Sequence, residues 1–449
     1  MKAKKIIALC LTCLFGFAPL CACNSDKGPS GPETKPVNAN YDPLGLNEIA
    51  IGIYITPDDA HREQKYFDYM VEAGINFVNG FRWYEDTDDE VMQCLNLAEK
   101  AGLPFLVNDK TVLDNIETYF QTKNAVLLES SMQQIQKYVD HPAYAGQFFI
   151  DEPYRDKLED LAEFTNLYEQ VFPGNFWNIN MFSPNVSELG CTYEQFMDDY
   201  FALTNARVYS YDHYPLLQYD ENDPYADGMD TGFYYGLDLV RSKTLERNIP
   251  FWTYIQAIGI GGADGILTKR DPSRNDIRWS EFINLAFGAK GLQYFTYFTP
   301  ASGAETFTEG LIDANGEKTE HYEAAKEVNQ EIKAFGNILL FSDAEGVIFN
   351  KQPSNNRYKL YTEPFESYGR VESTGGDTFV AGCFRHTSTG KQYLLITPHT
   401  PLDSAHVELN VTGSGAFEAY VHGQRTEVTA ENGKVSFDIA AGDAVFIQV

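Results

Sequence analysis

The sequence is poor in the residues on which metalloenzymes and disulfide-rich proteins depend. It contains 7 cysteines in 449 residues, and most of them lie at or before position 23. The other three, Cys94, Cys191 and Cys383, are far apart and odd in number, so they indicate neither a disulfide framework nor a cysteine-rich metal motif. The histidines are scattered, without HExxH or HxH spacing, which argues against a zinc enzyme. We therefore expect no metal and no other cofactor.

Positive charge is also scarce. The chain has 34 Lys and Arg against 64 Asp and Glu, which gives a formal net charge of −30. Such a surface repels phosphates, so nucleic acids and anionic membrane surfaces are excluded as partners and neutral substrates are favoured. Aromatic residues make up 14% of the chain, with 28 Tyr and 31 Phe. Aromatic rings serve as stacking platforms in carbohydrate sites, although exported proteins in general are also rich in tyrosine.

The N-terminus has the pattern of an export signal. Lys2, Lys4 and Lys5 precede an apolar run over residues 6–20, which is too short for an ordinary transmembrane helix. The run closes with Leu-Cys-Ala-Cys, which resembles the lipobox of bacterial lipoproteins. The resemblance implies a signal peptide over residues 1–22 and a diacylglycerol anchor on Cys23. The alternative is a plain signal peptide that is rich in cysteine.

The residues after the lipobox are polar and rich in Pro and Gly. We expect residues 23–45 to form a lipidated flexible tether. Asn24 follows the cysteine, and in this respect the chain resembles lipoproteins sent to the outer membrane of Bacteroides-type bacteria. The resemblance implies an outer-membrane protein that faces either the periplasm or the cell surface.

Apolar, strand-like runs alternate with helical patterns over residues 46–340. Two of the helical patterns end at Gly74 and Gly102, where a left-handed C-terminal residue is expected. Such alternation predicts parallel strands joined by crossover helices, and eight strands in this length predict a (β/α)8 TIM barrel. The expected strands are residues 49–55, 76–81, 104–108, 146–150, 176–181, 207–212, 250–256 and 291–298. Residues 215–235 and 258–266 are predicted as loops after strands six and seven.

After residue 340 the pattern changes to short alternating apolar segments separated by turn residues. Examples are residues 377–385, 391–397 and 405–411. The pattern predicts a C-terminal all-β sandwich domain over residues 341–449. Such a domain acts either as a packing or spacer domain or as a sugar-binding module.

The fourth expected strand delivers two adjacent carboxylates, Asp151 and Glu152, to its carboxyl end, and Pro153 follows. Cleavage of a glycoside needs a carboxylic acid to protonate the leaving group and an anionic group to meet the oxocarbenium-like transition state. Two neighbouring carboxylates repel, which raises one pKa and keeps a proton available near neutral pH. The alternative is that Asp151 caps the next helix and Glu152 is solvated.

This Asp-Glu-Pro motif resembles that of glycoside-hydrolase barrels of the Asn-Glu-Pro type, in which the Glu is the acid/base. That resemblance makes Glu152 the catalytic acid. An adjacent Asp-Glu pair is also similar to that of the β-hexosaminidases and β-N-acetylgalactosaminidases that work by substrate assistance. There the Asp, here Asp151, orients the acetamido group of the substrate. The run 278–298, with its Gly-Ala-Lys-Gly segment, also resembles the approach to the last strand of several sugar-hydrolase barrels.

Other strand ends supply further candidates. Asp212, after strand six, is predicted as a nucleophile, a base or a sugar-binding residue, with a loop cap as the alternative. Retaining enzymes of the Asn-Glu-Pro type carry a nucleophilic Glu near the end of strand seven, where this sequence has Gln256. That departure leaves substrate assistance, an inverting route through Asp212 or a barrel without turnover. The predicted sugar contacts are Trp83, Asn180, Tyr211, Tyr214, Trp252, Tyr254, Gln256 and Tyr297.

These features predict a glycoside hydrolase with Glu152, Asp151 and Asp212 as its catalytic carboxyl groups. We expect an oligosaccharide or polysaccharide substrate, first of all one with an N-acetylated sugar. The alternative is a non-catalytic, cell-surface glycan-binding lipoprotein with a degenerate glycosidase barrel. A purely structural lipoprotein would have no reason to cluster acids, amides and tyrosines at strand ends.

Overall fold

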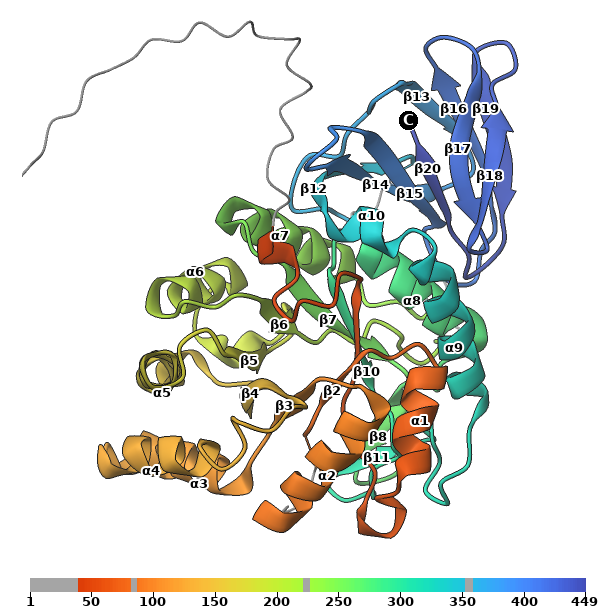
Figure 1. Cartoon of the computed structure of the whole chain (residues 1–449). Helices are drawn as coiled ribbons and strands as arrows, with labels where there is room; N and C mark the ends of the chain where they lie inside the picture. Colours follow the sequence, from red (N-terminus) through yellow and green to blue (C-terminus); the bar gives the residue numbers. More distant parts are fainter. Residues whose placement is uncertain (1–38, 82–86, 221–226, 352–357) are drawn as a thin grey trace, which may run out of the picture. The chain divides into compact units, whose positions relative to one another are not determined.

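The computed structural model describes residues 39–81, 87–220, 227–351 and 358–449 (Figure 1). The predicted signal peptide, Cys23 and most of the predicted tether lie outside the described residues. Within the described residues, the model contains no helix of sufficient length and apolar character to span a bilayer.

Eight parallel strands close into a barrel in the order β1-β10-β7-β6-β5-β4-β3-β2 (Figure 1). Strands β1, β5, β7 and β10 are buried along their whole length. Burial on both faces explains why they appear in the sequence as nearly continuous apolar runs. Each strand falls on a predicted one, and the predicted (β/α)8 barrel is confirmed. The barrel strands are β1 (Ala50–Ile53), β2 (Phe77–Asn79), β3 (Phe105–Val107), β4 (Tyr144–Asp151), β5 (Phe176–Met181), β6 (Tyr209–Tyr211), β7 (Phe251–Gln256) and β10 (Gly291–Phe295).

Helices surround the barrel, and their ends follow local sequence signals. Helix α2 starts with a capping box in which Glu90 accepts a 2.6 Å hydrogen bond from the Thr87 N–H. It stops at Gly102, whose φ of 73° is readily available only to glycine. The helices are α1 (Gln64–Glu72), α2 (Asp88–Ala101), α3 (Lys110–Thr122), α4 (Val126–Ile135), α5 (Leu158–Val171), α6 (Tyr193–Leu203), α7 (Phe233–Arg247), α8 (Arg274–Ala286), α9 (Glu320–Lys333) and α10 (Gly336–Leu340).

The connections after β7 and β10 contain a second, small sheet. It consists of β8 (Ile260–Gly262), β9 (Leu267–Lys269) and β11 (Glu305–Phe307), in the order β11-β8-β9. The sequence analysis predicted only a loop over residues 258–266, because strands of three residues are too short to show a period. We call these three strands the small sheet.

The C-terminal strands form two antiparallel sheets with a core of their own. In β16 the buried residues alternate with more exposed ones, as a strand with one face in a core requires. The predicted sandwich is confirmed. One sheet has the order β12-β14-β15-β20-β17-β18 and the other β13-β16-β19. The strands are β12 (Ser342–Phe349), β13 (Val371–Gly376), β14 (Phe379–His386), β15 (Gln392–Pro398), β16 (Ala405–Val411), β17 (Ala416–Val421), β18 (Gln424–Thr429), β19 (Lys434–Ile439) and β20 (Val445–Gln448).

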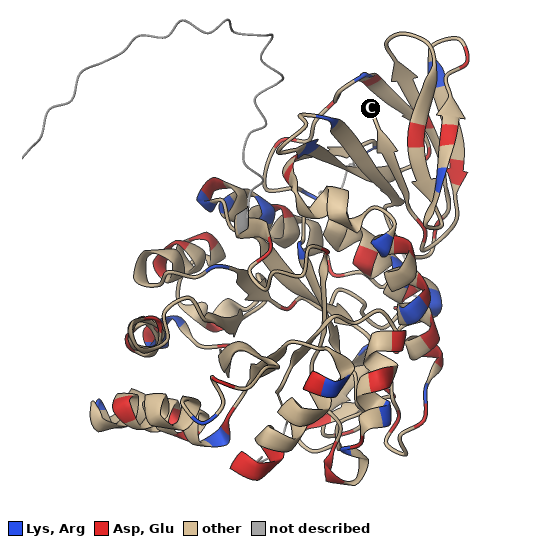
Figure 2. Cartoon of the chain, in the orientation of Figure 1, with Lys and Arg blue, Asp and Glu red and all other residues tan. Residues whose placement is uncertain are grey.

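Charged residues are distributed unevenly over the barrel. Figure 2 shows acidic and basic residues along the surrounding helices, whereas the strands at the centre are mostly free of them. Asp151, Glu152 and Asp212 are exceptions, because they lie at or directly after the ends of barrel strands.

Candidate active site

The carboxyl ends of three adjacent strands bring the predicted catalytic side chains together. Asp151, the last residue of β4, pairs in register with Asn180 on β5, and Asn180 pairs with Ser210 on β6. Glu152 follows β4 and Asp212 follows β6. Because all strands of the barrel are parallel, these ends share one rim, and barrels of this kind carry their active sites there.

A cavity of about 320 Å³ lies at this rim. Its size is at the lower end of the range of roughly 300–1,000 Å³ that is usual for small-molecule sites. Among the described residues, no group of three or more His, Cys, Asp or Glu is placed to hold a metal ion. The residues that line the cavity are Tyr54, Asp151, Glu152, Asn180, Asp212, Tyr214, Tyr254, Ile260, Thr268, Lys269, Phe295 and Glu305.

Asp151 is held from two sides. The Tyr54 hydroxyl donates a 2.6 Å hydrogen bond to one carboxyl oxygen, and the Asn180 amide donates a 2.9 Å bond to the other. The same amide nitrogen lies 3.2 Å from Asp212, and Ser210 donates to the Asn180 carbonyl oxygen at 3.0 Å. Since Ser210 fixes which way the amide points, Asn180 presents its donor to both carboxylates.

Glu152 and Asp212 both line the cavity, and their carboxyl groups are close enough to act on each other electrostatically and as hydrogen-bond partners. Two carboxyl groups can make such a bond only when one of them carries a proton. Burial raises the pKa of Glu152, and the negative charges of Asp212 and Asp151 raise it further. Burial also raises the pKa of Asp212, to about 7, and the charge of Asp151 adds to that rise, whereas hydrogen bonds from Glu152 and Asn180 oppose it. The pKa of Glu152 is raised further, to about 10, so a proton shared by the pair resides on Glu152 and Asp212 is the group that ionises first.

Asp151 is the third carboxyl group of the cluster. Burial raises its pKa, whereas hydrogen bonds from Tyr54, from Asn180 and from the Glu152 backbone lower it. These donors stabilise the charged form that burial disfavours. A negative charge is thereby kept beside Glu152, where it helps to retain the proton.

The backbone next to the cluster adopts left-handed conformations. Glu152 has a φ of 46°, and Ile55, which follows Tyr54, has a φ of 68°. Such angles are uncommon for residues other than glycine, and for a β-branched residue they are outliers. Each costs on the order of 1–3 kcal/mol, and strain of this kind concentrates at functional sites.

The predicted sugar contacts are distributed over several environments. Asn180, Tyr214 and Tyr254 line the cavity beside the three carboxyl groups. Trp83 lies outside the described residues.

The other predicted contacts do not line this cavity. Trp252 is fully buried in the barrel, with its ring centroid 5.0 Å from that of Phe77. Tyr211 is buried as well, and its neighbour Ser210 is the residue that contacts Asn180. The Tyr297 hydroxyl donates to the backbone carbonyl of Tyr66 at 2.6 Å.

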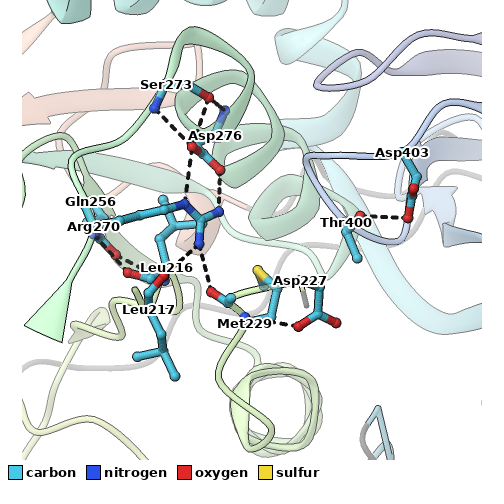
Figure 3. A network of polar contacts seen from close by, with 11 residues as sticks. Leu216, Leu217, Asp227, Met229, Gln256, Arg270, Ser273, Asp276, Thr400 and Asp403 are labelled. Carbon is cyan, nitrogen blue, oxygen red and sulfur yellow. Dashed lines mark hydrogen bonds and ion pairs between the residues drawn. The ribbon is translucent and has the colours of Figure 1, made fainter. Parts of the chain in front are cut away.

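Gln256 is bound to backbone instead of facing the cavity (Figure 3). Its carbonyl oxygen accepts a 3.1 Å hydrogen bond from the Leu216 N–H. Its amide nitrogen donates to the Leu216 carbonyl at 3.3 Å and to the Arg270 carbonyl at 3.0 Å. The side chain is therefore fully engaged as a connection between two loops.

The sequence analysis missed several residues of the cavity. Tyr54 follows β1, and its place at a strand end was a usable signal. Lys269, Thr268 and Glu305 belong to the small sheet, which no sequence period indicated. Lys269 is the one cationic residue among those described that line the cavity. Burial lowers its pKa, and the charges of Asp230 and Asp212 oppose that effect.

Comparisons with known proteins find similarity to glycoside hydrolases. Residues 175–335 match the model of a family described as β-galactosidase, glycoside hydrolase family 42. No curated protein sequence matches the chain significantly.

Several solved structures are similar. A β-galactosidase from Bacillus circulans sp. alkalophilus superposes with a TM-score of 0.58 at 10% identity, covering 90% of this chain and 99% of its own. A family 42 β-galactosidase from G. stearothermophilus gives 0.55 at 9% identity, with coverage of 90% and 99%. One from Marinomonas ef1 gives 0.48 at 14% identity, with coverage of 64% and 60%, so this chain spans about 60% of its length.

At these identities the structural likeness shows the fold alone, a barrel like that of these β-galactosidases. Together with the family match it supports the prediction of a glycosidase that acts on a carbohydrate.

Proposed function

We propose that the chain is a retaining glycoside hydrolase with Glu152 as its general acid and Asp212 as its nucleophile. The observation that carries the proposal is that these two carboxyl groups line one cavity and act on each other's pKa. Two carboxyl groups that interact this closely fit a retaining pair, about 5 Å apart, better than an inverting pair, which leaves roughly 6.5–9.5 Å for its water. The inverting route through Asp212 is therefore disfavoured.

The reaction has two steps. In the first, the Asp212 carboxylate attacks the anomeric carbon, the glycosidic C–O bond breaks, and the Glu152 proton goes to the leaving oxygen. In the second, Glu152 takes a proton from water, the water oxygen bonds to the anomeric carbon, and the Asp212 ester is released. Asp151, oriented by Tyr54 and Asn180, keeps Glu152 protonated and accepts hydrogen bonds from sugar hydroxyls.

The family match makes β-galactosides the first substrates to test. The assay compares nitrophenyl β-galactoside with lactose-type oligosaccharides, using wild type, Glu152→Gln and Asp212→Asn. A 2-fluoro-β-galactoside traps a covalent intermediate, and peptide mass spectrometry locates the label. A label on Asp212 supports the proposal, whereas no turnover of any glycoside by the wild type overturns it.

The adjacent Asp151 and Glu152 favour a second candidate, cleavage at an N-acetylated sugar by substrate assistance. Asp151, with Tyr54 bonded to it, would orient the acetamido group that attacks its own anomeric carbon. Nitrophenyl β-N-acetylhexosaminides then replace the galactoside in the assay. Inhibition by a sugar-derived thiazoline, without a covalent label on Asp212, identifies this route.

Gln256 favours a third candidate, a glycan-binding protein without turnover, because the sequence resemblance implies a nucleophilic Glu there. Binding of oligosaccharides without release of any product, unchanged in Glu152→Gln, would establish it.

We also propose that the chain is anchored in the outer membrane through Cys23. The support is the lipobox-like end of the signal segment. Mass spectrometry of the membrane-extracted protein should find an acylated N-terminal Cys23, and Cys23→Ser should release the protein from the membrane fraction. Protease accessibility on intact cells then distinguishes a surface from a periplasmic orientation.

A further inference from the structure

We propose that Gln256 is a positioning residue, which holds the loop after β6 against the small sheet so that Thr268 and Lys269 contact the bound sugar. The inference rests on the proposed function to the extent that the ligand of the cavity is a sugar. The sequence resemblance implies a nucleophile at this strand-seven position, and the inference gives the position a structural role instead.

Gln256 joins two segments that are distant in the chain. It accepts from the Leu216 N–H and donates to the carbonyls of Leu216 and Arg270, at 3.1, 3.3 and 3.0 Å. Its side chain is only 1% exposed, so no water replaces a lost partner cheaply. Through these three hydrogen bonds, Gln256 connects the segments at Leu216 and at Arg270 to the barrel.

The two joined segments also pair with each other. The Arg270 N–H donates to the Leu216 carbonyl at 3.0 Å, and the Gln218 N–H donates to the Thr268 carbonyl at 3.2 Å. Leu217 forms a β-bridge with Lys269. Residues 216–218 therefore extend the small sheet beyond β9, and Gln256 fastens this added edge to the barrel.

Arg270 fastens the same edge from its other side (Figure 3). Its guanidinium donates to the carbonyls of Leu217 and Gly228 at 2.9 and 2.7 Å, and it forms a 2.5 Å ion pair with Asp276 at the start of α8. With both ends fixed, β9 has a set position, and Thr268 and Lys269 line the cavity from it.

Lys269 is suited to contact a sugar. Its ammonium group makes no hydrogen bond or ion pair with the described residues, although Asp230 and Asp212 act on it electrostatically. A partly buried ammonium without a close acceptor gains free energy when a ligand supplies one. Sugar hydroxyl and ring oxygens are such acceptors, and a sugar bound beside Glu152 would present them to Lys269.

Replacing the amide of Gln256 by a carboxylate removes hydrogen bonds between the barrel and the two segments. A glutamate at this position could accept from Leu216 but could not donate to the two carbonyls, and its charge would face their oxygens. A protonated carboxyl can accept one bond and donate another, so it restores most of the connection. The charged groups on the neighbouring elements are Asp212 after β6, Lys269 and Arg270 at β9, and Asp276 on α8.

The experiment compares Gln256→Glu, Gln256→Met and Lys269→Met with the wild type. Hydrogen–deuterium exchange follows residues 214–218 and 267–271, and calorimetry measures the Kd for galactose and for N-acetylgalactosamine between pH 4.5 and pH 8. We expect Gln256→Met to raise Kd about tenfold at every pH and to speed exchange in both segments. Gln256→Glu should do the same at pH 8 and approach the wild type at pH 4.5.

Lys269→Met is the matched control, because it removes the contact of Lys269 with the sugar and leaves the hydrogen bonds of Gln256 intact. It should raise Kd without changing exchange. Unchanged exchange in Gln256→Met overturns the positioning role, and unchanged Kd in Lys269→Met overturns the sugar contact. A gain in kcat for Gln256→Glu as the pH rises also overturns the inference, because it would identify a vestigial nucleophile. The exchange measurement needs neither hydrolysis nor a ligand, so it decides the positioning role of Gln256 even if the wild type turns over no glycoside and the proposed function is overturned.

Discussion

The rim of the barrel has two unlike sides. At the ends of β4, β5 and β6, the side chains of Asp151, Asn180 and Asp212 turn into the cavity and bond to one another. At the end of β7, Gln256 turns to backbone groups and leaves no polar atom for a ligand. Both sides are buried and polar, so burial and residue type alone do not separate a reactive group from a supporting one.

The difference lies in what satisfies the polar atoms. Backbone partners have fixed positions, so a side chain bonded to them is part of the framework. Side chains that bond to other ionisable side chains can exchange those partners for a substrate. The distinction predicts which substitutions reduce chemistry and which reduce stability.

The largest effect is expected for Glu152→Gln on the reactive side. Loss of the general acid should lower kcat/KM about 100- to 10,000-fold on oligosaccharides with poor leaving groups. On a dinitrophenyl glycoside, which leaves without a proton, the loss should be much smaller. Steady-state assays with both substrates test this, and equal losses on both would remove Glu152 from the acid role.

The second effect concerns the supporting side. Arg270→Met leaves Asp276 buried without its 2.5 Å partner, and this should lower the free energy of unfolding by about 3–5 kcal/mol. Urea denaturation followed by circular dichroism measures it. The exposed pair of Lys110 and Asp114 is the control, since its loss should cost about 1 kcal/mol or less. Similar costs for both pairs would contradict the framework role of Arg270.

The third effect is a shift in pH dependence. Activity should fall as the pH rises through the elevated pKa of Glu152, because the acid then loses its proton. Asp151→Asn removes one of the charges that raise this pKa, so the basic limb of the kcat/KM profile should move to lower pH by about one unit. Tyr54→Phe removes one of the hydrogen bonds that keep Asp151 charged, so it should move the limb in the same direction by a smaller amount. A limb that moves upward in Asp151→Asn would reverse the electrostatic assignment.

The smallest effect separates two tyrosines that the sequence analysis treated alike. Tyr214 lines the cavity, so Tyr214→Phe should weaken binding of galactose about two- to fivefold. Tyr297 donates to the Tyr66 carbonyl, so Tyr297→Phe should leave binding unchanged and lower stability by about 1 kcal/mol. Calorimetry and thermal unfolding on both variants test the pair. Weaker binding of galactose in Tyr297→Phe would contradict the prediction, because it would mean that Tyr297 contributes to the binding site.

The fold could be predicted largely because the barrel strands are buried on both faces. Each strand appears as an apolar run, and a run that ends in a carboxylate indicates a group on the rim, as for Asp151 and Asp212. The orientation of a side chain and its height in the barrel were not predictable. Trp252, Tyr254 and Gln256 are every second residue of β7 and therefore share one face. Of the three, only Tyr254 lines the cavity, because Trp252 packs inside the barrel and Gln256 is bound to the loops.

The small sheet shows the other limit of sequence reasoning. Its strands of three residues are stabilised by backbone pairing between segments far apart in the chain, such as Gly262 with Glu305. The local conformational preferences of the sequence do not indicate such long-range pairing. Lys269 and Glu305 were missed for that reason, although they line the cavity.

The hydrogen bond from Tyr54 to Asp151 has a consequence for how the protein folds. Tyr54 follows the first strand of the barrel, and that strand pairs with β10, so that Ala50 lies beside Gly291. Contacts between such distant segments form late, after the entropy of closing a long loop has been overcome. Asp151 consequently gains its Tyr54 partner only after β1 has joined the barrel. Recovery of full activity after dilution from denaturant thus reports the joining of β1 to the barrel. Folding intermediates without β1 in place lack the Tyr54 hydrogen bond and should not be fully active.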